Sequence, residues 1–130
     1  MQNLFRCLAL VFLMGLFGSI YPGGARAAEE PIIIVVKFFP GEGREGEAQE
    51  RLAKLAAFVP KHNPGVTFSL HRSTKGPSVF LLYETFPSQA ALDNQQKTVL
   101  PAFLKEVGAA PQGLFSRANE VEFYRLLSEK

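Results

Sequence analysis

Apolar residues along the chain follow two different periods, and the first clear pattern belongs to a strand. Residues 32–39 are almost all isoleucine, valine and phenylalanine, bounded by Pro31 and Pro40. The apolar residues occupy both alternation phases, which is typical of a strand that is buried on both faces. We therefore expect a central strand at this position.

A helical period follows this strand. Apolar residues recur at intervals of one helical turn, at Ala48, Leu52, Leu55, Ala56 and Val59. The positions between them are mostly charged or polar, so the pattern predicts a helix with one side on a core. We expect Pro60 and the run Asn63-Pro64-Gly65 to end it.

The second half of the chain predicts a hairpin, a helix and a last strand. Residues 66–73 and 78–86 have strand patterns, and the short glycine-containing connection between them favours an antiparallel hairpin. Ser88 is a candidate N-cap for a helical stretch that continues to Val107. Pro101 is expected to break or kink it, and one alternative makes Pro101 the first residue of a second short helix after Thr98. Residues 120–126 form the final predicted strand.

The order β-α-β-β-α-β predicts an α+β fold of the ferredoxin-like type, with both helices on one face of a four-stranded antiparallel sheet. The first and third strands are apolar on both faces, whereas the helices of one chain cover only one face. A second copy of the sheet is the simplest cover for the other face. We therefore expect a homodimer whose two sheets close a barrel-like core.

Residues 1–27 have the pattern of an export signal. Arg6 precedes a nearly unbroken apolar run at 7–20, and Ala25-Arg26-Ala27 is a small–x–small cleavage site. The run is shorter than the roughly 20 residues that span a bilayer. We expect a secreted or periplasmic protein with one domain at 28–130 and no membrane contact after cleavage; a retained N-terminal anchor is the alternative.

Removing this leader changes what the composition allows. The whole chain has 14 Lys and Arg, 12 Asp and Glu, and one Cys. Arg6, Arg26 and Cys7 all belong to the leader, so the remaining chain is formally neutral and has no thiol. Thiolate chemistry and cysteine-ligated metals are excluded. A neutral chain also gives no reason to expect a nucleic-acid partner.

Residues 41–46 spell G-x-G-x-x-G between a strand and a helix, which is nominally a dinucleotide-binding motif. The next strand pairs in a hairpin and not in a parallel βαβ unit. Glu42 and Glu45 would also place negative charge where a pyrophosphate should lie. We interpret the segment as a flexible turn and expect no bound cofactor.

Two histidines are candidates for proton chemistry. His62 is expected to be solvated in a turn. His71 shares one phase of its strand with Thr67 and Ser69. This phase is either an exposed face or the polar wall of a pocket, in which His71 would accept a phenolic proton. No cluster of histidine, cysteine and carboxylate residues predicts a metal site.

Tyr83 and Arg72 are the remaining polar candidates in the hairpin. Tyr83 is either an ordinary core tyrosine or a hydroxyl that donates to a quinone or phenol oxygen. Arg72 lies on the opposite phase to His71, where it reaches solvent or pairs with an acid such as Glu84. Hydrolase and phosphotransferase motifs are absent from the sequence.

Three segments together resemble the antibiotic biosynthesis monooxygenase (ABM) family: Leu70-His71-Arg72, the run from Val79 to Phe86, and Ser88 with Ala91-Leu92. The resemblance implies a small dimeric α+β barrel. It also implies oxidation of quinols or polyketide phenols by O₂ without a bound cofactor, although one branch of the family degrades haem.

Tyr83 and Glu84 match the end of the family's third strand. Other positions depart from the family pattern: Leu82 for an asparagine, Phe86 for a tryptophan, Leu92 for a tyrosine and Val99 for a histidine. These departures leave two functions open. One is an exported monooxygenase for a quinol or phenol; the other is a non-catalytic periplasmic dimer that binds a hydrophobic ligand such as a quinone or haem.

The enzyme hypothesis places a small aromatic or quinone-like ligand in a pocket between the sheet and the helices. Its expected catalytic residues are His71 and Tyr83. Its expected substrate-binding residues are Phe86, Leu82, Arg72 and Glu84.

Overall fold

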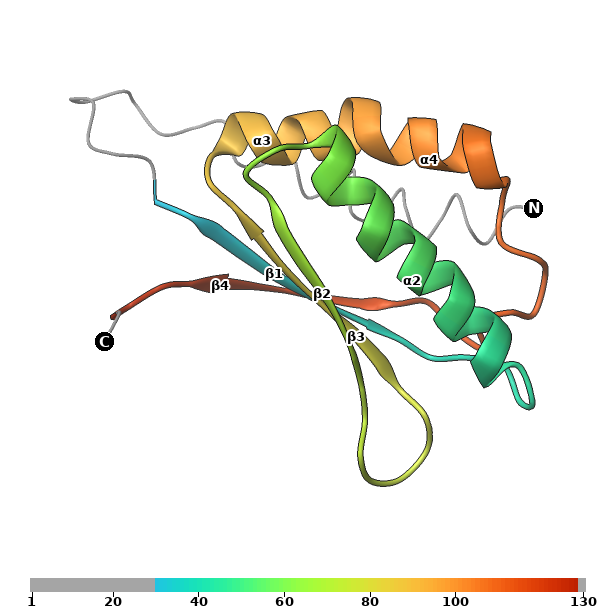
Figure 1. The fold of residues 1–130 in the computed structure, drawn as a ribbon. Helices are drawn as coiled ribbons and strands as arrows, with labels where there is room; N and C mark the ends of the chain where they lie inside the picture. Colours follow the sequence, from blue (N-terminus) through green and yellow to red (C-terminus); the bar gives the residue numbers. More distant parts are fainter. Residues whose placement is uncertain (1–29, 129–130) are drawn as a thin grey trace.

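The computed structural model describes residues 30–128 of the chain, and the expected leader at 1–27 and cleavage site lie outside the described residues. Its strands are β1 (Ile32–Phe38), β2 (Thr67–Arg72), β3 (Phe80–Phe86) and β4 (Glu120–Arg125). They form one sheet in the order β2-β3-β1-β4, and each neighbouring pair is antiparallel. Helix α2 (Glu45–His62) and a second helical stretch lie on the same face of this sheet (Figure 1). The ferredoxin-like prediction is confirmed.

The pairing register decides which side chains face the helices. Directly opposed residues of an antiparallel pair point to the same face. Ile34 and Phe68 both lie opposite Glu84, and Ile34 is 1% exposed in the core. Val35 and Ser69 both lie opposite Tyr83, so these three residues belong to the outer face, away from the helices.

Helix α2 continues through Pro60 and ends directly before the run Asn63-Pro64-Gly65, which was expected to stop it. Pro60 lies inside its last turn, and the helix ends at His62. A proline has no backbone N–H, so one hydrogen bond from residue i to residue i−4 is missing at Pro60. The Asn63 backbone N–H still donates to the Val59 carbonyl at 2.8 Å, and the buried Asn63 side chain anchors this end on the second helical stretch.

The second helical stretch is continuous and contains a π-helical turn. It consists of α3 (Gln89–Asn94), η1 (Gln95–Val99) and α4 (Leu100–Val107). The Ser88 hydroxyl accepts from the Ala91 backbone N–H at 3.1 Å, as its N-cap prediction requires. Pro101 does not break the helix, because it lies in the first turn of α4, where its missing donor costs little. The irregularity is the π turn before it, in which the Leu100 N–H donates to the Gln95 carbonyl.

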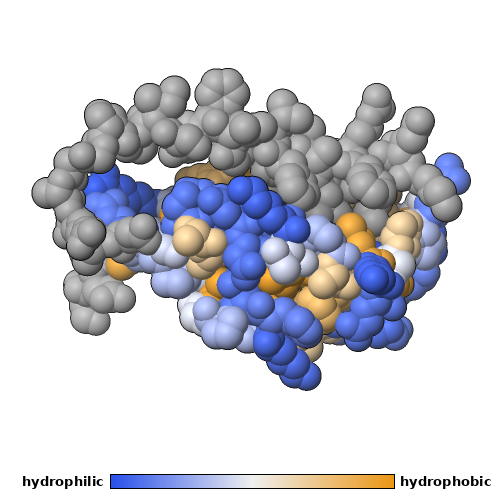
Figure 2. Space-filling model, turned by 90° about the horizontal axis from the view of Figure 1, so that it is seen from above, coloured by the Kyte–Doolittle hydropathy of each residue, from blue (hydrophilic) through white to orange (hydrophobic). Residues whose placement is uncertain are grey.

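Apolar side chains from the sheet and helices form a core between these two layers. Its most buried large members are Phe80, Phe86, Ile34, Leu82, Leu114, Val59 and Val99. Where the helical side of the molecule is visible in Figure 2, it carries mostly hydrophilic residues with smaller hydrophobic areas between them. Within residues 30–128, no helix has the length and apolar character needed to cross a membrane.

Candidate functional site

A cavity of about 770 Å³ lies between the sheet and the helices. Strands β1, β2 and β3 form its floor, while α2, the second helical stretch and the loop before β4 form its walls. Most of the lining side chains are apolar: Ile34, Val36, Phe38, Leu52, Leu55, Phe68, Leu82, Phe86, Leu92, Leu100, Phe103 and Leu104. A concave site of this size and composition suits a flat, largely apolar small molecule.

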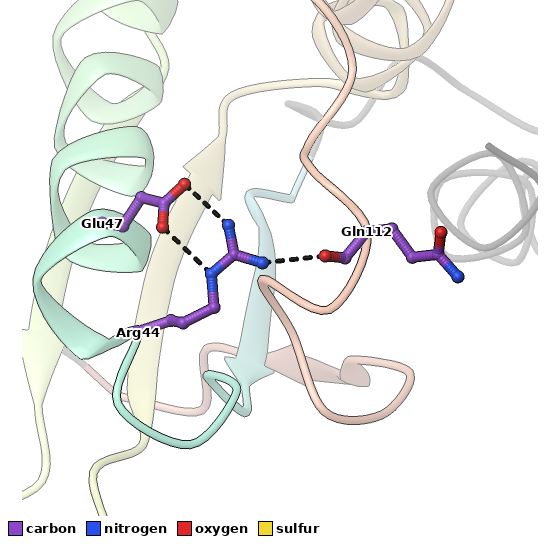
Figure 3. A network of polar contacts seen from close by, with 3 residues as sticks. All are labelled: Arg44, Glu47 and Gln112. Carbon is purple, nitrogen blue, oxygen red and sulfur yellow. Dashed lines mark hydrogen bonds and ion pairs between the residues drawn. The ribbon is translucent and has the colours of Figure 1, made fainter.

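The loop at residues 108–119, which closes one side of the cavity, is fastened to the start of α2. Arg44 donates to both carboxylate oxygens of Glu47, at 2.8 and 3.0 Å, and to the backbone carbonyl of Gln112 at 2.8 Å (Figure 3). Gly41 donates its backbone N–H to the Leu114 carbonyl at 2.7 Å. The first part of the G-x-G-x-x-G segment is a turn, its last two residues begin α2, and the turn braces this wall.

Glu84 places a carboxyl group in the apolar wall of the cavity. It is the only acidic residue among the described residues that line the cavity. Burial raises the pKa of the Glu84 carboxyl to about 8, because an ionised carboxylate loses its hydration among apolar side chains. At neutral pH the group is therefore mostly protonated.

Gln95 and Gln96 add two amide groups to the same cavity from the π-helical turn. Both are almost fully buried. Asn63 donates from Nδ2 to the Ala91 carbonyl at 3.0 Å and to Gln95 Oε1 at 3.2 Å, while Asn94 donates to Asn63 Oδ1 at 3.2 Å. This network ties the turn to the end of α2 and fixes the orientation of the Gln95 amide.

Two arginines line the cavity, and each already has partners. Arg51 of α2 donates to the Gly108 carbonyl at 2.6 Å and lies 5.8 Å from the centre of the Phe103 ring. Arg117 of the loop lies 3.6 Å from the centre of the Phe39 ring and pairs with Glu120 at 3.3 Å. Burial lowers the pKa of the Arg51 guanidinium. Neither arginine counteracts the raised pKa of Glu84, which is caused by burial.

The structure divides the six predicted site residues into three groups. Leu82, Glu84 and Phe86 line the cavity. His71 and Tyr83 lie on the outer face of the sheet, opposite Leu81 and Ser69 respectively. The expectation that one pocket holds Phe86, Tyr83 and His71 together is therefore corrected, because alternate residues of a strand point to opposite faces.

Arg72 forms the third group. It lies on the phase of β2 that faces the helices, but it is exposed near the end of the strand and is not part of the cavity lining. Its guanidinium donates to the Ser78 hydroxyl at 3.1 Å. Of the two expected alternatives, Arg72 therefore takes the one in which it reaches solvent, and it does not pair with Glu84.

Both histidines are exposed. His71 Nε2 lies 2.9 Å from the Ser69 hydroxyl on the outer face. His62 lies at the end of α2 and stacks on Phe58 with ring centres 3.7 Å apart, so it is solvated as expected but helical. Among residues 30–128, no group of three or more histidine, cysteine and acidic side chains is arranged to hold a metal ion.

Sequence reasoning missed Gln95 and Gln96 as cavity residues. A signal for them exists, because they occupy the helical positions between Leu92 and Val99, where the period demands buried side chains. Two polar residues at such positions indicate a hydrogen-bond network or a polar site. No comparable sequence signal identifies the two arginines or the loop at residues 108–119 as parts of the cavity. The loop in particular has no periodic pattern.

The family model described as antibiotic biosynthesis monooxygenase matches residues 31–105. A candidate antibiotic biosynthesis monooxygenase from Caulobacter crescentus has a similar structure, with a TM-score of 0.63 at 20% identity over 78% of this chain and 93% of that one. A Pseudomonas aeruginosa protein has a TM-score of 0.66 at 16% identity, over 78% and 99% of the two chains.

A haem degrader from Mycobacterium tuberculosis, solved with two haems in its active site, has a TM-score of 0.57 at 17% identity over 76% of this chain and 98% of that one. At these identities the three structures support the fold alone. No curated protein sequence matches the chain.

Proposed function

Because the chain belongs to the antibiotic biosynthesis monooxygenase family, whose model covers more than half of its length, we propose that it is an exported monooxygenase. Its substrate is a planar quinol or phenol, bound in the cavity between sheet and helices, and its oxidant is O₂ without a bound cofactor. The leader pattern at residues 1–27 supports export.

The cavity is the observation that carries this proposal. It is large enough for a substrate of two or three fused rings, and Phe68, Phe86 and Phe103 offer aromatic surfaces to such a molecule. In the reaction of an anthrone, one oxygen atom of O₂ becomes the new carbonyl oxygen and the other leaves as water with the two hydrogens of the methylene group. No external reductant is needed, so the contributions of the protein are orientation, exclusion of water and stabilisation of the substrate anion.

A non-catalytic ligand carrier is the second candidate, and the placement of His71 and Tyr83 favours it. Both residues lie on the outer face, so neither reaches a ligand inside the cavity. Neither of the two histidines, both of which the structure describes, lines the cavity. The lining therefore has no imidazole to bind a haem iron, and a quinone is the better candidate for a carried ligand.

We also propose that the protein is a homodimer joined through the outer face of its sheet. This face carries a group of apolar and aromatic residues on its central strands and on β4: Ile33, Val35, Leu81, Tyr83 and Tyr124. Tyr83 and Tyr124 are 40% and 50% exposed in one chain. An apolar sheet face of this kind supports association with a second copy.

Oxygen uptake by the purified protein over a panel of hydroquinones and anthrones tests the enzyme proposal. Leu82→Trp would fill the cavity and is expected to reduce uptake at least about tenfold, because it removes space for the substrate. Tyr83→Phe and His71→Ala, on the outer face, are the matched controls and should leave uptake within about twofold. Circular dichroism would confirm that each variant is folded.

The outcomes separate the candidates. Uptake that falls in the outer-face variants and not in Leu82→Trp would overturn the cavity as the site and restore the catalytic roles predicted for His71 and Tyr83. Saturable binding of quinones without oxygen uptake would replace the enzyme by the carrier. If the protein shows no oxygen uptake and no ligand binding over the whole panel, the enzyme and the carrier are both contradicted.

A further inference from the structure

Glu84 is a carboxyl group with no hydrogen-bond or ion-pair partner among residues 30–128. On its own strand it lies between Leu82 and Phe86, the next residues on the same face, and across the sheet it lies opposite Ile34 and Phe68. Its oxygens are not sealed in protein, because no fully enclosed side-chain oxygen or nitrogen in the described part of the chain lacks a partner. The carboxyl group therefore opens onto the cavity that it lines.

An apolar wall determines which form of this carboxyl group is stable. An isolated carboxylate in such surroundings is costly, whereas a protonated carboxyl is neutral and has one O–H to donate. Neither of the two lining arginines forms an ion pair with Glu84, since Arg51 donates to the Gly108 carbonyl and Arg117 pairs with Glu120. The neutral, donating form is therefore the one that fits the cavity.

Gln95 presents a second donor, and its orientation follows from its neighbours. The Ala91 carbonyl can only accept, so the group of Asn63 that faces it is the NH₂. The same NH₂ reaches Gln95, which must turn its oxygen toward Asn63. The Gln95 NH₂ then has no described partner and, like the Glu84 oxygens, is not sealed in protein. Since Gln95 lines the cavity, this NH₂ is available to a ligand.

We propose that Glu84, as a neutral carboxylic acid, and Gln95 donate hydrogen bonds to oxygen atoms of the ligand. The inference rests on the proposed function, which it refines. Two donors in an apolar cavity suit a carbonyl or an anionic oxygen, so the ligand class is a quinone, or a phenol or anthrone bound as its anion. Donors placed where negative charge develops stabilise that charge strongly in a site without bulk water.

This role differs from that of a general base, and the difference can be measured. A base must be a carboxylate, so Glu84→Gln would abolish it. A donor survives the same substitution, because the glutamine amide has nearly the same shape and its NH₂ also donates. Glu84→Leu removes the polar group, so it abolishes the function whether Glu84 acts as a base or as a donor. For the second donor, Gln95→Glu keeps the oxygen that Asn63 requires and replaces the NH₂.

The donor role also sets the sign of the pH dependence. As the pH rises through the pKa of Glu84, the carboxyl loses its proton, and the resulting carboxylate repels a ligand oxygen. The other charged groups lining the cavity are Arg51 from α2 and Arg117 from the loop. The lining residues from β1, β2 and the second helical stretch are not titratable. Glu84 alone is therefore expected to produce the dependence.

Calorimetric titration of the protein with 1,4-naphthoquinone at about pH 6 and about pH 9.5 tests this inference. One neutral hydrogen bond corresponds to roughly a fivefold change in affinity. The wild type should bind at least about fivefold more weakly at the higher pH. Glu84→Gln should bind equally at both and within about threefold of the wild type at pH 6. Glu84→Leu and Gln95→Glu should each bind at least about fivefold more weakly at pH 6.

Glu106→Gln, an exposed carboxyl on α4, is the matched control and should keep the wild-type pH dependence. Quinone binding that depends on Glu84 without any oxygen uptake would support the inference while removing the enzyme proposal. Oxygen uptake that disappears in Glu84→Gln, with quinone binding unchanged, would overturn the donor role in favour of a base. Affinity that is indifferent to pH, to Glu84→Leu and to Gln95→Glu would overturn the whole inference.

Discussion

At the scale of single residues, the environment of a side chain matters more than its type. His71 and Tyr83 have the chemistry expected of catalytic groups, yet both lie on the outer face of the sheet. Glu84 has an ordinary side chain whose behaviour changes because it lies among Leu82, Phe86 and Phe68. Its sequence signal is its phase, which it shares with Phe80, Leu82 and Phe86 of the same strand.

The pKa of Glu84 predicts how the stability of the unliganded protein depends on pH. The folded-state pKa of about 8 is above the ordinary value of 4.5 expected for the unfolded chain, so the folded protein holds this proton more tightly. The stabilising contribution is therefore complete below about pH 4.5 and is lost as the pH rises through about 8. Each pKa unit corresponds to about 1.4 kcal/mol, and because the carboxyl group opens onto a cavity, solvent screening is expected to reduce the total to roughly 3 kcal/mol.

Urea unfolding of the wild type and Glu84→Gln between about pH 4 and pH 9 measures this effect. Relative to the wild type, Glu84→Gln should gain roughly 3 kcal/mol in free energy of unfolding over this interval. Glu106→Gln should show no such gain. Parallel pH profiles for wild type and Glu84→Gln would contradict the assignment of a buried, neutral carboxyl group.

At the scale of elements, the periodic segments were predictable and their interruptions were not. Apolar periodicity located four strands and two helical stretches, with ends correct to within a few residues. The two prolines were poor guides to the helix ends, because α2 continues through Pro60 in its last turn and Pro101 lies in the first turn of α4. The π turn before α4 carries the Gln95 side chain that accepts from Asn63, a contact between distant segments that local sequence does not encode.

The G-x-G-x-x-G segment at residues 41–46, which spans a turn and the start of α2, gives a prediction that separates two of its glycines. A Cβ atom at Gly41 would lie 2.1 Å from the Gly113 carbonyl oxygen, whereas a Cβ at Gly46 would meet nothing within 4 Å. Gly41→Ala should therefore lower the free energy of unfolding by about 2–3 kcal/mol, because the loop must move away from α2. Gly46→Ala lies within a helix and should raise it by up to about 1 kcal/mol.

Thermal unfolding of the two glycine variants beside the wild type tests this prediction. A change of 1 kcal/mol corresponds to about 4–8 °C in Tm for a domain of this size. Gly41→Ala should thus melt at least about 8 °C below Gly46→Ala. Equal melting temperatures would show that the loop at 108–119 is not held at Gly41.

At the scale of the whole molecule, the outer face of the sheet predicts the assembly. If two sheets pack on each other, Tyr83 becomes buried between them. Tyr83→Lys would then place two ammonium groups, one from each copy, in an apolar interface, which is strongly unfavourable. Sedimentation at about 10 µM should give a dimer for the wild type and a monomer for Tyr83→Lys. Thr74→Lys, exposed in the hairpin connection, is the control and should remain a dimer.

A monomeric mass for the wild type under these conditions would contradict the homodimer. A dimer that persists in Tyr83→Lys would contradict the outer face as its interface. Because Tyr83 is 40% exposed in one chain, the substitution should not unfold the monomer, and circular dichroism checks this.

The sequence by itself determined the order of elements, the fold class and which residues of each strand share a face. Alternation carries this information because a strand has a period of two. It also determined that Leu82, Glu84 and Phe86 share one face of the sheet, but not which face that is.

Only the tertiary structure decided which face the helices cover. Both phases of β1 and β3 are apolar, so the pattern does not distinguish the cavity side from the outer side. For this reason the sequence prediction placed His71 and Tyr83 in the pocket, whereas they lie on the outer face. The structure also joined segments far apart in the chain, such as Arg44 with Gln112 and Asn63 with Gln95. These contacts depend on packing between layers, which no local period encodes.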